Sequence, residues 1–312
     1  FRQAYGTGSL PEQQNRQLLH DIGQLYCGVE SWQSCEKTLA QWIQVAPEKV
    51  RSEHHIMRAY AYSMMEQWSD VIAPVSKALA AKINEGEKVP LAWHQLGVTA
   101  NIQLQQWERA VALQQVLLKN YPNKSAEWRQ LVSLHLQNKD YKSALATQRL
   151  GYQRGLLVSP RDIRQVAELM AFNGLPFIAA KVIKEGLAEG VLKKNVRNLE
   201  LQANLWLHAL EYEQAADVYS QLVNIEAKKK WVKKLAELHI TSRNWSEATR
   251  VLQSFVGSFV DSKADPNLNL LLGITLTNQQ RYNEAKRYFE AASSDKELQS
   301  VVEAWLQYLQ QV

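Results

Sequence analysis

Residues 230–256 read KWVKKLAELHITSRNWSEATRVLQSFV, and the rest of the chain repeats the pattern of this stretch. Its apolar residues recur at the helical period on either side of a short polar break, which predicts two amphipathic helices joined by a tight turn. Small Ala236 precedes small Ala248 by twelve residues, and Trp245 lies three residues before Ala248. Small side chains let two antiparallel helices approach closely, and the aromatic residue fills the turn. One such hairpin cannot bury its apolar face alone, so it requires stacked neighbours.

Copies of this hairpin follow one another at a period of roughly 34 residues, which is typical of the tetratricopeptide repeat. The other hairpins are predicted at 15–47, 52–85, 91–122, 125–157, 160–190, 196–227 and 266–294. We therefore predict an all-α, right-handed superhelical solenoid of about eight hairpins. Residues 1–14 are expected to end a preceding element, 15–296 to form one solenoid domain, and 297–312 to form a capping helix.

The composition favours helices and gives no indication of a membrane span. The 312 residues include 13 Gly and 8 Pro, and 21% are charged. The net charge of +5 is spread out, with its densest run at 228–230, so no nucleic-acid partner is expected. No apolar run reaches the roughly 18 residues of a membrane helix. The chain starts without Met or an apolar leader, so we expect a fragment whose signal peptide would lie upstream.

The sequence shows no catalytic or cofactor-binding motif. It lacks GxGxxG, HExxH, CxxC and a phosphate loop. His54 and His55 are adjacent on a predicted helix and face different directions, so they are poorly placed to chelate one metal. We predict a protein that is not an enzyme, with no metal and no cofactor.

The two cysteines, Cys27 and Cys35, flank the turn of the first predicted hairpin. The connection of seven residues brings their backbones close enough for a disulfide. Such a bond would imply an oxidising compartment. The alternative is a pair of free thiols in a cytosolic protein, since Cys35 occupies one of the small-residue positions.

The predicted binding surface is the concave groove lined by the first helix of each hairpin. Variable positions of those helices are expected to point inward, and they are rich in Arg and polar residues. The predicted groove residues are His94, Arg129, Ser133, Gln137, Arg161, Arg164, Glu168, Arg197, Glu200, Asn204, His208, Lys233 and Glu237. An extended peptide with acidic groups would suit this surface, because Arg pairs with carboxylates through its planar fork. The alternative is an inner face that is merely solvated.

A narrower resemblance covers 145–215. There LATQRLGYQRGLL is followed by ELMAFNGLPFIAAKVIKEGLAEGVLKKNVRNLELQANLWLHALEYEQA. The NGLPF turn, the KVIKEGLAEGV helix end and the NLELQANLWL helix resemble the periplasmic tetratricopeptide proteins encoded beside TonB, ExbB and ExbD in gammaproteobacteria. This resemblance implies a secreted scaffold that supports TonB-dependent uptake of iron complexes by binding transport components. A cytosolic adaptor or regulator, and a scaffold for envelope or polysaccharide assembly, remain alternatives.

Overall fold

The computed structural model describes residues 11–256 and 265–312, and within them the chain forms seventeen α-helices and no strand. The chain divides into two compact units, residues 1–157 and 158–312. The first unit contains α2 (Glu12–Gly28), α3 (Trp32–Val45), the 3-10 helix η1 (Pro47–Lys49), α4 (Ser52–Met64), α5 (Trp68–Asn84), α6 (Leu91–Gln103), α7 (Trp107–Asn120), α8 (Ser125–Gln137) and α9 (Tyr141–Gln153).

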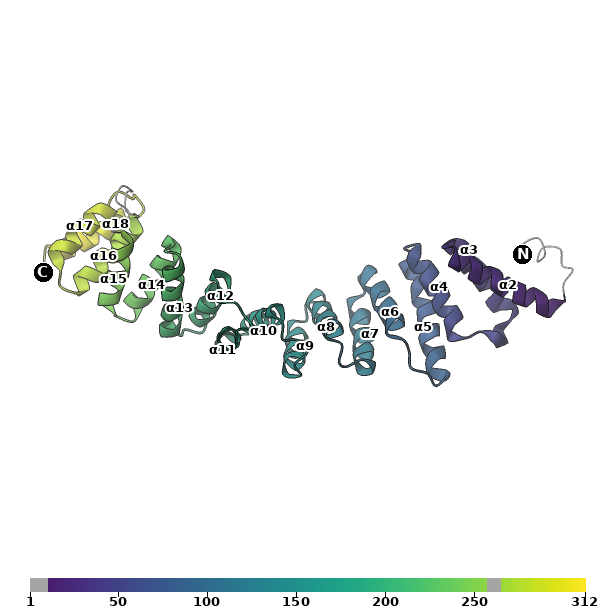
Figure 1. Cartoon of the computed structure of the whole chain (residues 1–312). Coiled ribbons are helices and arrows are strands. Elements are labelled where there is room, and N and C mark those ends of the chain that lie inside the picture. The colour runs from purple at the N-terminus through teal and green to yellow at the C-terminus, as the bar shows by residue number, and fades with distance from the viewer. Residues whose placement is uncertain (1–10, 257–264) are drawn as a thin grey trace. The chain divides into compact units, whose positions relative to one another are not determined.

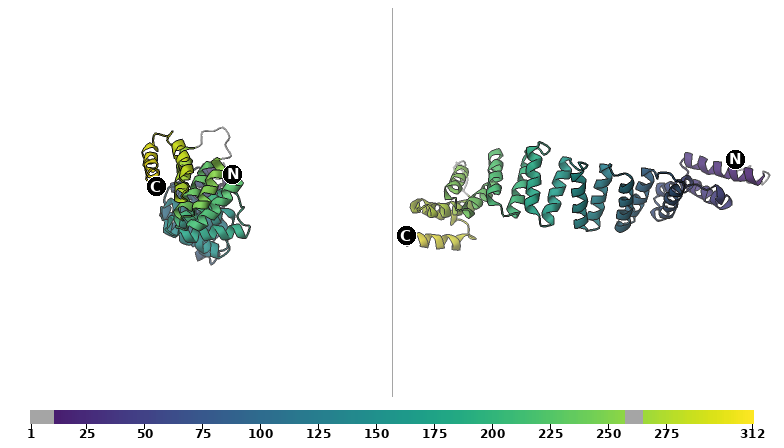
Figure 2. Two further views of the ribbon diagram at one scale, coloured as in Figure 1. Left: turned by 90° about the vertical axis from the view of Figure 1, so that its left-hand side faces the viewer. Right: turned by 90° about the horizontal axis from the view of Figure 1, so that it is seen from below.

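The second unit continues the same alternation of helix and tight turn. It contains α10 (Pro160–Phe172), α11 (Pro176–Ala188), α12 (Val196–His208), α13 (Tyr212–Ile225), α14 (Lys229–Thr241), α15 (Trp245–Val256), α16 (Pro266–Asn278), α17 (Tyr282–Ala292) and α18 (Gln299–Leu309). Within each unit every helix packs against the next one in sequence, as Figures 1 and 2 show. The helices pair as α2 with α3, α4 with α5, and so on to α16 with α17, after which α18 packs on α17.

The prediction of an all-α stack of about eight hairpins followed by a C-terminal helix is confirmed. The predicted element before the first hairpin lies mostly outside the described residues, and α2 already begins at Glu12. The handedness of the stack and a single domain over 15–296 stay predictions.

Each hairpin buries its small residues where its two helices cross. The sixteen positions concerned are fully or nearly fully buried: Gly23, Cys35, Ala59, Val71, Gly97, Ala110, Val132, Ala144, Ala167, Ala180, Ala203, Ala215, Ala236, Ala248, Gly273 and Ala285. A Cβ added to Gly273 would lie 2.5 Å from Cε1 of buried Phe289. The close approach of α16 and α17 therefore requires a residue without a side chain at this point.

All eight hairpins turn in the same way, through three residues of which the middle one has a positive φ. These middle residues are Glu30, Glu66, Gln105, Lys139, Gly174, Leu210, Arg243 and Gln280. In the α12–α13 turn the N–H of Leu210 donates to the carbonyl of Leu207, and the N–H of Glu211 donates to the carbonyl of Trp206. This is the Schellman arrangement, which satisfies the last carbonyls of the first helix. The shared turn therefore fixes the register of every hairpin.

We expect Leu210→Gly to raise the free energy of unfolding by roughly 1 kcal/mol, because a left-handed backbone strains any residue with a Cβ. Leu210 has a φ of 61° and a 69% exposed side chain, so little packing is lost. The matched change Gly174→Ala, at the equivalent position with a φ of 79°, should lower stability by a similar amount. Urea unfolding followed by circular dichroism measures the free energy of unfolding of both variants. If both substitutions raise it, or both lower it, the left-handed backbone does not determine the effect.

Cys27 and Cys35 are joined by a disulfide across the α2–α3 turn, with 4.9 Å between their Cα atoms. Of the two alternatives open from the sequence, the structure therefore has the bonded one. Tyr26, Trp32 and Leu39 belong to the same apolar cluster as the two cysteines. The bond thus ties the first hairpin together inside its own core.

Candidate functional site

The first helices of the second unit present a continuous set of polar side chains in a common register. Arg161, Arg197 and Lys230 each stand thirteen residues before the left-handed residue of their own turn. Because the turns are alike, these three residues occupy the same level of α10, α12 and α14. All three are exposed.

Two further levels follow on the same helices, one turn apart. The first holds Arg164, Glu200 and Lys233, and the second holds Glu168, Asn204 and Glu237. All six side chains are exposed or half-buried, and His208 at the end of α12 is exposed. We call the nine residues of these three levels, together with His208, the first-helix face of the second unit.

Glu200 is the best-anchored residue of this face. Its Oε1 accepts from Nζ of Lys230, at 2.5 Å, and from Nε1 of buried Trp231, at 3.2 Å, so α12 and α14 are linked directly. The hydrogen bond from Lys230 holds the pKa of Glu200 below its ordinary value. The carboxylate therefore stays charged and already has its partners.

Asn204 and Glu237 also have partners within the unit. Oδ1 of Asn204 accepts from the hydroxyl of Tyr219, at 2.8 Å, and burial raises the pKa of that tyrosine to about 12. Glu237 accepts from Nζ of Lys234 at 3.2 Å. These contacts fix the polar middle of the face.

The arginines behave differently. Arg161, Arg164 and Arg197 make no hydrogen bond or ion pair with any residue that the structure describes. An unpaired guanidinium offers five N–H donors and a full charge to a ligand. The chemistry that this face has available for a partner is therefore recognition of carboxylates.

In the first unit, α8 carries the predicted residues Arg129, Ser133 and Gln137. Ser133 and Gln137 are exposed and Arg129 is half-buried, as expected for this face. These three residues and His94 belong to the first unit, and the remaining predicted groove residues belong to the second.

His94 of α6 does not face the groove as predicted, because its side chain is buried and only 3% exposed. Neither ring nitrogen has a partner among the described residues. The exposed residues of α6 are instead Ala92, Gln95, Thr99 and Gln103. A shift of one residue turns a side chain by about 100° around a helix, which carries it from solvent into the core.

The corrected register of α6 reveals a polar cluster that sequence reasoning missed. Glu127 of α8 is 6% exposed and accepts from Nε2 of Gln95, at 2.7 Å, and from Nε2 of Gln114, at 2.8 Å. The Gln114 amide also donates to the Glu127 carbonyl at 2.9 Å. These residues line a hollow of about 350 Å³ between α6, α7 and α8. Three polar residues from three helices gave no signal in sequence, since they are far apart in the chain.

We expect stability to fall as the pH drops from 7.5 to 5. Burial lowers the pKa of five histidines below 6.5: His54, His55, His94, His135 and His239. Between the lowered folded value and 6.5 the unfolded chain binds more protons, so acidification favours unfolding. The stabilisation is complete above pH 6.5 and is lost as the pH falls toward the folded values.

Urea midpoints at several pH values measure this effect. In the variant His94→Leu the urea midpoint should depend less on pH than in the unaltered chain, because one buried histidine is gone. His208→Gln, at the exposed end of α12, is the matched control and should leave the pH dependence unchanged. A midpoint that stays constant or rises on acidification in this window would contradict the expectation.

The residues described contain no group of three or more His, Cys, Asp or Glu side chains arranged to hold a metal ion. No helix within 11–256 or 265–312 has the length and apolar character needed to cross a membrane.

Comparison with solved structures finds other helical-repeat proteins. A tetratricopeptide repeat protein from Parabacteroides merdae shares 15% identity over 83% of this chain and 98% of its own, with a TM-score of 0.42. The TPR2AB-domain:pHSP90 complex of yeast Sti1 shares 10% identity over 89% of this chain and 98% of that chain, with a TM-score of 0.42. The Naa15/Naa10 structure bound to HypK-THB shares 14% identity over 94% of this chain and 50% of that chain, with a TM-score of 0.43.

No protein-family model and no curated protein sequence matches the chain. The assignment of the fold rests on the pairing of the helices themselves.

Proposed function

We propose that the chain is a non-enzymatic scaffold that binds an extended, acidic segment of a partner protein across the first-helix face of the second unit. One observation carries this proposal: Arg161 and Arg197 lie at the same level of neighbouring repeats, Arg164 lies one turn further along α10, and none of the three has a counter-ion among the described residues. Charge-assisted pairs between Arg and carboxylate are the strongest contacts that such a surface can offer.

The residues around these arginines support an extended ligand. Glu200, Asn204 and Glu237 accept hydrogen bonds from Lys230, Tyr219 and Lys234, so these three acceptors already have partners and the arginines do not. Arg161 and Arg197 lie on α10 and α12, the first helices of successive repeats. An extended segment that runs across the repeats can therefore place acidic residues against both helices.

A defined peptide tests this proposal. The probe is a fluorescent 15-residue Gly/Ser peptide with Glu at every third position, measured by anisotropy with the whole chain at low and high salt. We expect binding that weakens with salt, because the pairs are exposed and screened. A matching peptide with Lys in place of Glu should not bind.

The variant Arg161→Ala/Arg164→Ala/Arg197→Ala should bind the acidic peptide at least about tenfold more weakly, since three exposed pairs contribute about 0.5 kcal/mol each. The matched control removes three positive charges from other exposed positions of the same unit: Lys184→Ala/Lys194→Ala/Arg287→Ala. If the two triple variants lose the same affinity for the acidic peptide, the effect is due to net charge alone, and the assignment of the site is wrong.

We propose further that the scaffold works in the periplasm, in TonB-dependent uptake of iron complexes. Two observations support the compartment and the pathway respectively. Disulfides such as Cys27–Cys35 persist in oxidising compartments. The sequence at 145–215 resembles the periplasmic tetratricopeptide proteins encoded beside the TonB system.

Cross-linking and mass spectrometry in the native cell, without added reductant, test the compartment and the pathway together. TonB-system peptides linked to the first-helix face, with the disulfide intact, would support both. Cytosolic partners together with free thiols would overturn both and favour the adaptor alternative. Subunits of a polysaccharide synthase or exporter would instead keep the compartment and replace the pathway.

A further inference from the structure

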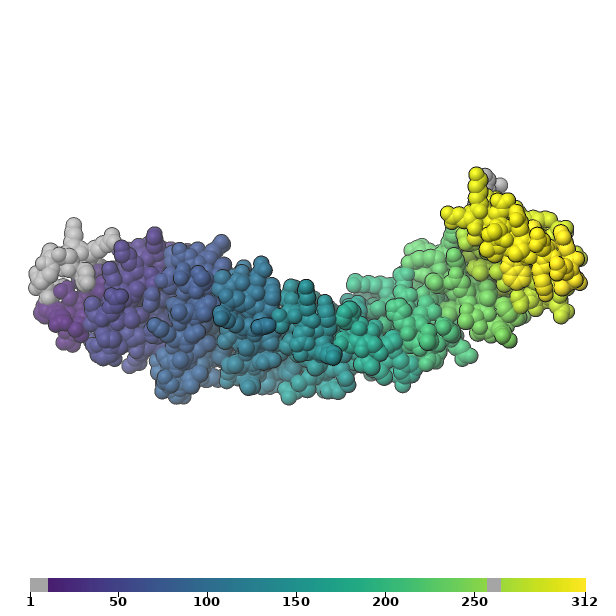
Figure 3. All heavy atoms as spheres, turned by 180° about the vertical axis from the view of Figure 1, so that it is seen from behind, coloured from purple at the N-terminus to yellow at the C-terminus, as the bar shows by residue number. Residues whose placement is uncertain are grey.

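The second unit contains a pocket that lies apart from the first-helix face and was not anticipated from the sequence. Its volume is about 750 Å³, and it opens between the end of α16, the α16–α17 turn and α18. α18 lies exposed at the end of this unit, in yellow in Figure 3. The polar and aromatic lining consists chiefly of Thr277, Asn278, Gln280, Tyr282, Trp305 and Tyr308.

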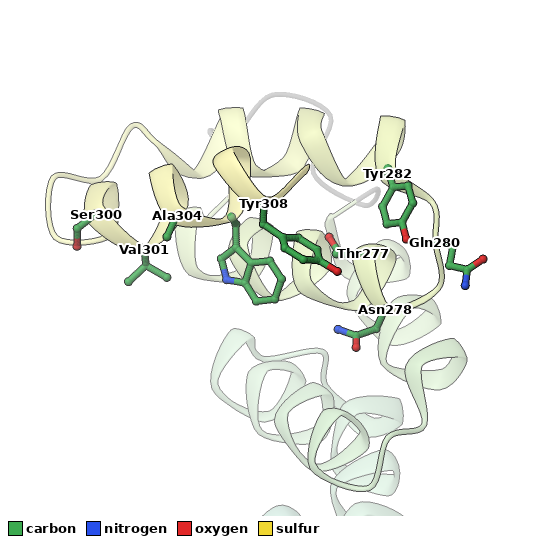
Figure 4. A pocket seen from close by; sticks show the side chains of 9 residues that line it. Thr277, Asn278, Gln280, Tyr282, Ser300, Val301, Ala304 and Tyr308 are labelled. Atoms are coloured by element: carbon green, nitrogen blue, oxygen red, sulfur yellow. The ribbon is translucent and has the colours of Figure 1, made fainter. Parts of the chain in front are cut away.

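None of the nine residues that line the pocket is charged. In Figure 4 the ring of Tyr308 extends from α18 toward Thr277 and Asn278, while Gln280 and Tyr282 stand at the other side. The missing charge sets this pocket apart from the arginine-rich face.

Two aromatic rings form a fixed corner of the pocket. The indole of Trp305 stacks on the buried ring of Phe289, with 5.6 Å between centroids and 12° between planes. Tyr308 stands nearly perpendicular to the indole, at 5.9 Å and 88°. Because Phe289 anchors the indole from the core, the corner keeps its shape without a ligand.

The lining offers hydrogen-bond donors that have no acceptor within the described part of the chain. These are Nε1 of Trp305, the hydroxyls of Tyr282 and Tyr308, and the amide of Gln280. By contrast, the Asn278 amide already donates to the Ile274 carbonyl, and the Thr277 hydroxyl donates to the Gly273 carbonyl. The pocket therefore combines apolar ring faces with an excess of free donors.

The chemistry of a polyproline II segment complements this combination. Its backbone makes no internal hydrogen bonds, so every carbonyl can accept one, and proline has no N–H to donate. Its rings present apolar surfaces that pack on aromatic side chains. We propose that this pocket binds a proline-rich, extended segment of a partner protein, with Trp305 donating to a backbone carbonyl.

An oligosaccharide fits the same pocket less well. Sugar hydroxyls donate as well as accept, and the lining receives them only through amide and hydroxyl oxygens, without a carboxylate. The aromatic rings also meet at a right angle instead of forming one flat platform. Sugar binding is therefore the outcome that would contradict the proposal.

Titration of the whole chain with a fluorescent deca-proline peptide tests the proposal, with a Gly/Ser decapeptide and cellohexaose as comparison ligands. We expect deca-proline to bind with little salt dependence and the other two not to bind. Absence of deca-proline binding, or preferential binding of cellohexaose, would overturn the proposal.

Variants of Tyr308 locate the site, because its side chain is 45% exposed and its removal should not unfold the unit. Tyr308→Ala should weaken deca-proline binding about tenfold, and Tyr308→Phe, which removes only the hydroxyl, about threefold. Tyr60→Ala, at a 37% exposed tyrosine of the first unit, is the matched control and should leave the affinity unchanged. Equal affinities of Tyr308→Ala and the unaltered chain would refute the site.

A nuclear magnetic resonance measurement reports the donor directly. The indole N–H signal of Trp305, assigned by its loss in Trp305→Phe, should move on addition of deca-proline while the other indole signals stay in place. A stationary Trp305 signal under conditions in which the peptide binds would show that the peptide sits elsewhere. These outcomes are independent of the acidic-peptide experiment, since that ligand and that face are different.

Discussion

We expect Trp231→Ala to lower the free energy of unfolding of the second unit by about 3–5 kcal/mol. Trp231 lies at the start of α14 (Lys229–Thr241), its side chain is 2% exposed, and it is among the largest fully buried side chains described. Its truncation would leave a cavity that neighbouring helices cannot fill without moving. It would also remove the N–H that holds Glu200 of α12.

Two further variants separate the causes of this loss. Trp231→Phe keeps an apolar ring and loses the hydrogen bond, so it should cost about 1–2 kcal/mol. Ile225→Ala, at the 53% exposed end of α13, should cost less than about 0.5 kcal/mol and controls for truncation as such.

Urea unfolding gives the change in the free energy of unfolding for each Trp231 variant, and hydrogen exchange shows which helices lose protection. Stacked repeats contact only their neighbours, so the loss of protection should concentrate in α12 to α16. A cost for Trp231→Ala no larger than that of Ile225→Ala would contradict the assigned packing role.

The hairpins were predictable because their determinants are local. The spacing of Ala236 and Ala248, with Trp245 between them, specifies two helices and the point where they cross, and the structure buries both alanines completely. Seven of the eight second helices begin at a Trp or Tyr, as Trp245 does in α15. These features act within one repeat, so a single sequence contains them in full.

The turn conformation and the exact register were less accessible. Leu210 takes a left-handed conformation although leucine does not favour it, because the hairpin imposes the same turn on whichever residue stands there. In α6 the period alone did not distinguish His94 from Gln95, although one is buried and the other exposed. Only packing against the adjacent helices decides between neighbouring positions on such an apolar helix.

The pocket beside α18 depends on contacts that no repeat pattern encodes. The C-terminal helix was predicted as a cap, and Val302, its one buried residue, is consistent with that role. The orientation of α18, however, is set by Trp305 stacking on Phe289 of α17. That contact leaves Tyr308 and Val301 open to solvent, and sequence alone gives no means of foreseeing which face of a short terminal helix stays uncovered.

Loss of the Cys27–Cys35 disulfide should be the second large effect, with a cost of about 2.5 kcal/mol to the first hairpin. The bond spans eight residues of sequence, and closing a loop of this length restricts the unfolded chain by about that amount. Cys27→Ala/Cys35→Ala is the suitable variant, because alanine preserves the small side chain that buried Cys35 places at the helix crossing. The reduced, unaltered chain should lose nearly the same stability as this variant.

Hydrogen exchange of the oxidised, reduced and Cys-to-Ala chains distinguishes a local constraint from a wider one. Because each hairpin contacts only its neighbours, protection should fall in α2 and α3, partly in α4, and not in the second unit. If the reduced chain keeps full protection in α2 and α3, the disulfide does not stabilise the fold. It would then no longer support an oxidising compartment. If protection falls as expected, the first hairpin depends on oxidation, and a reducing compartment would leave this end of the stack open to local unfolding.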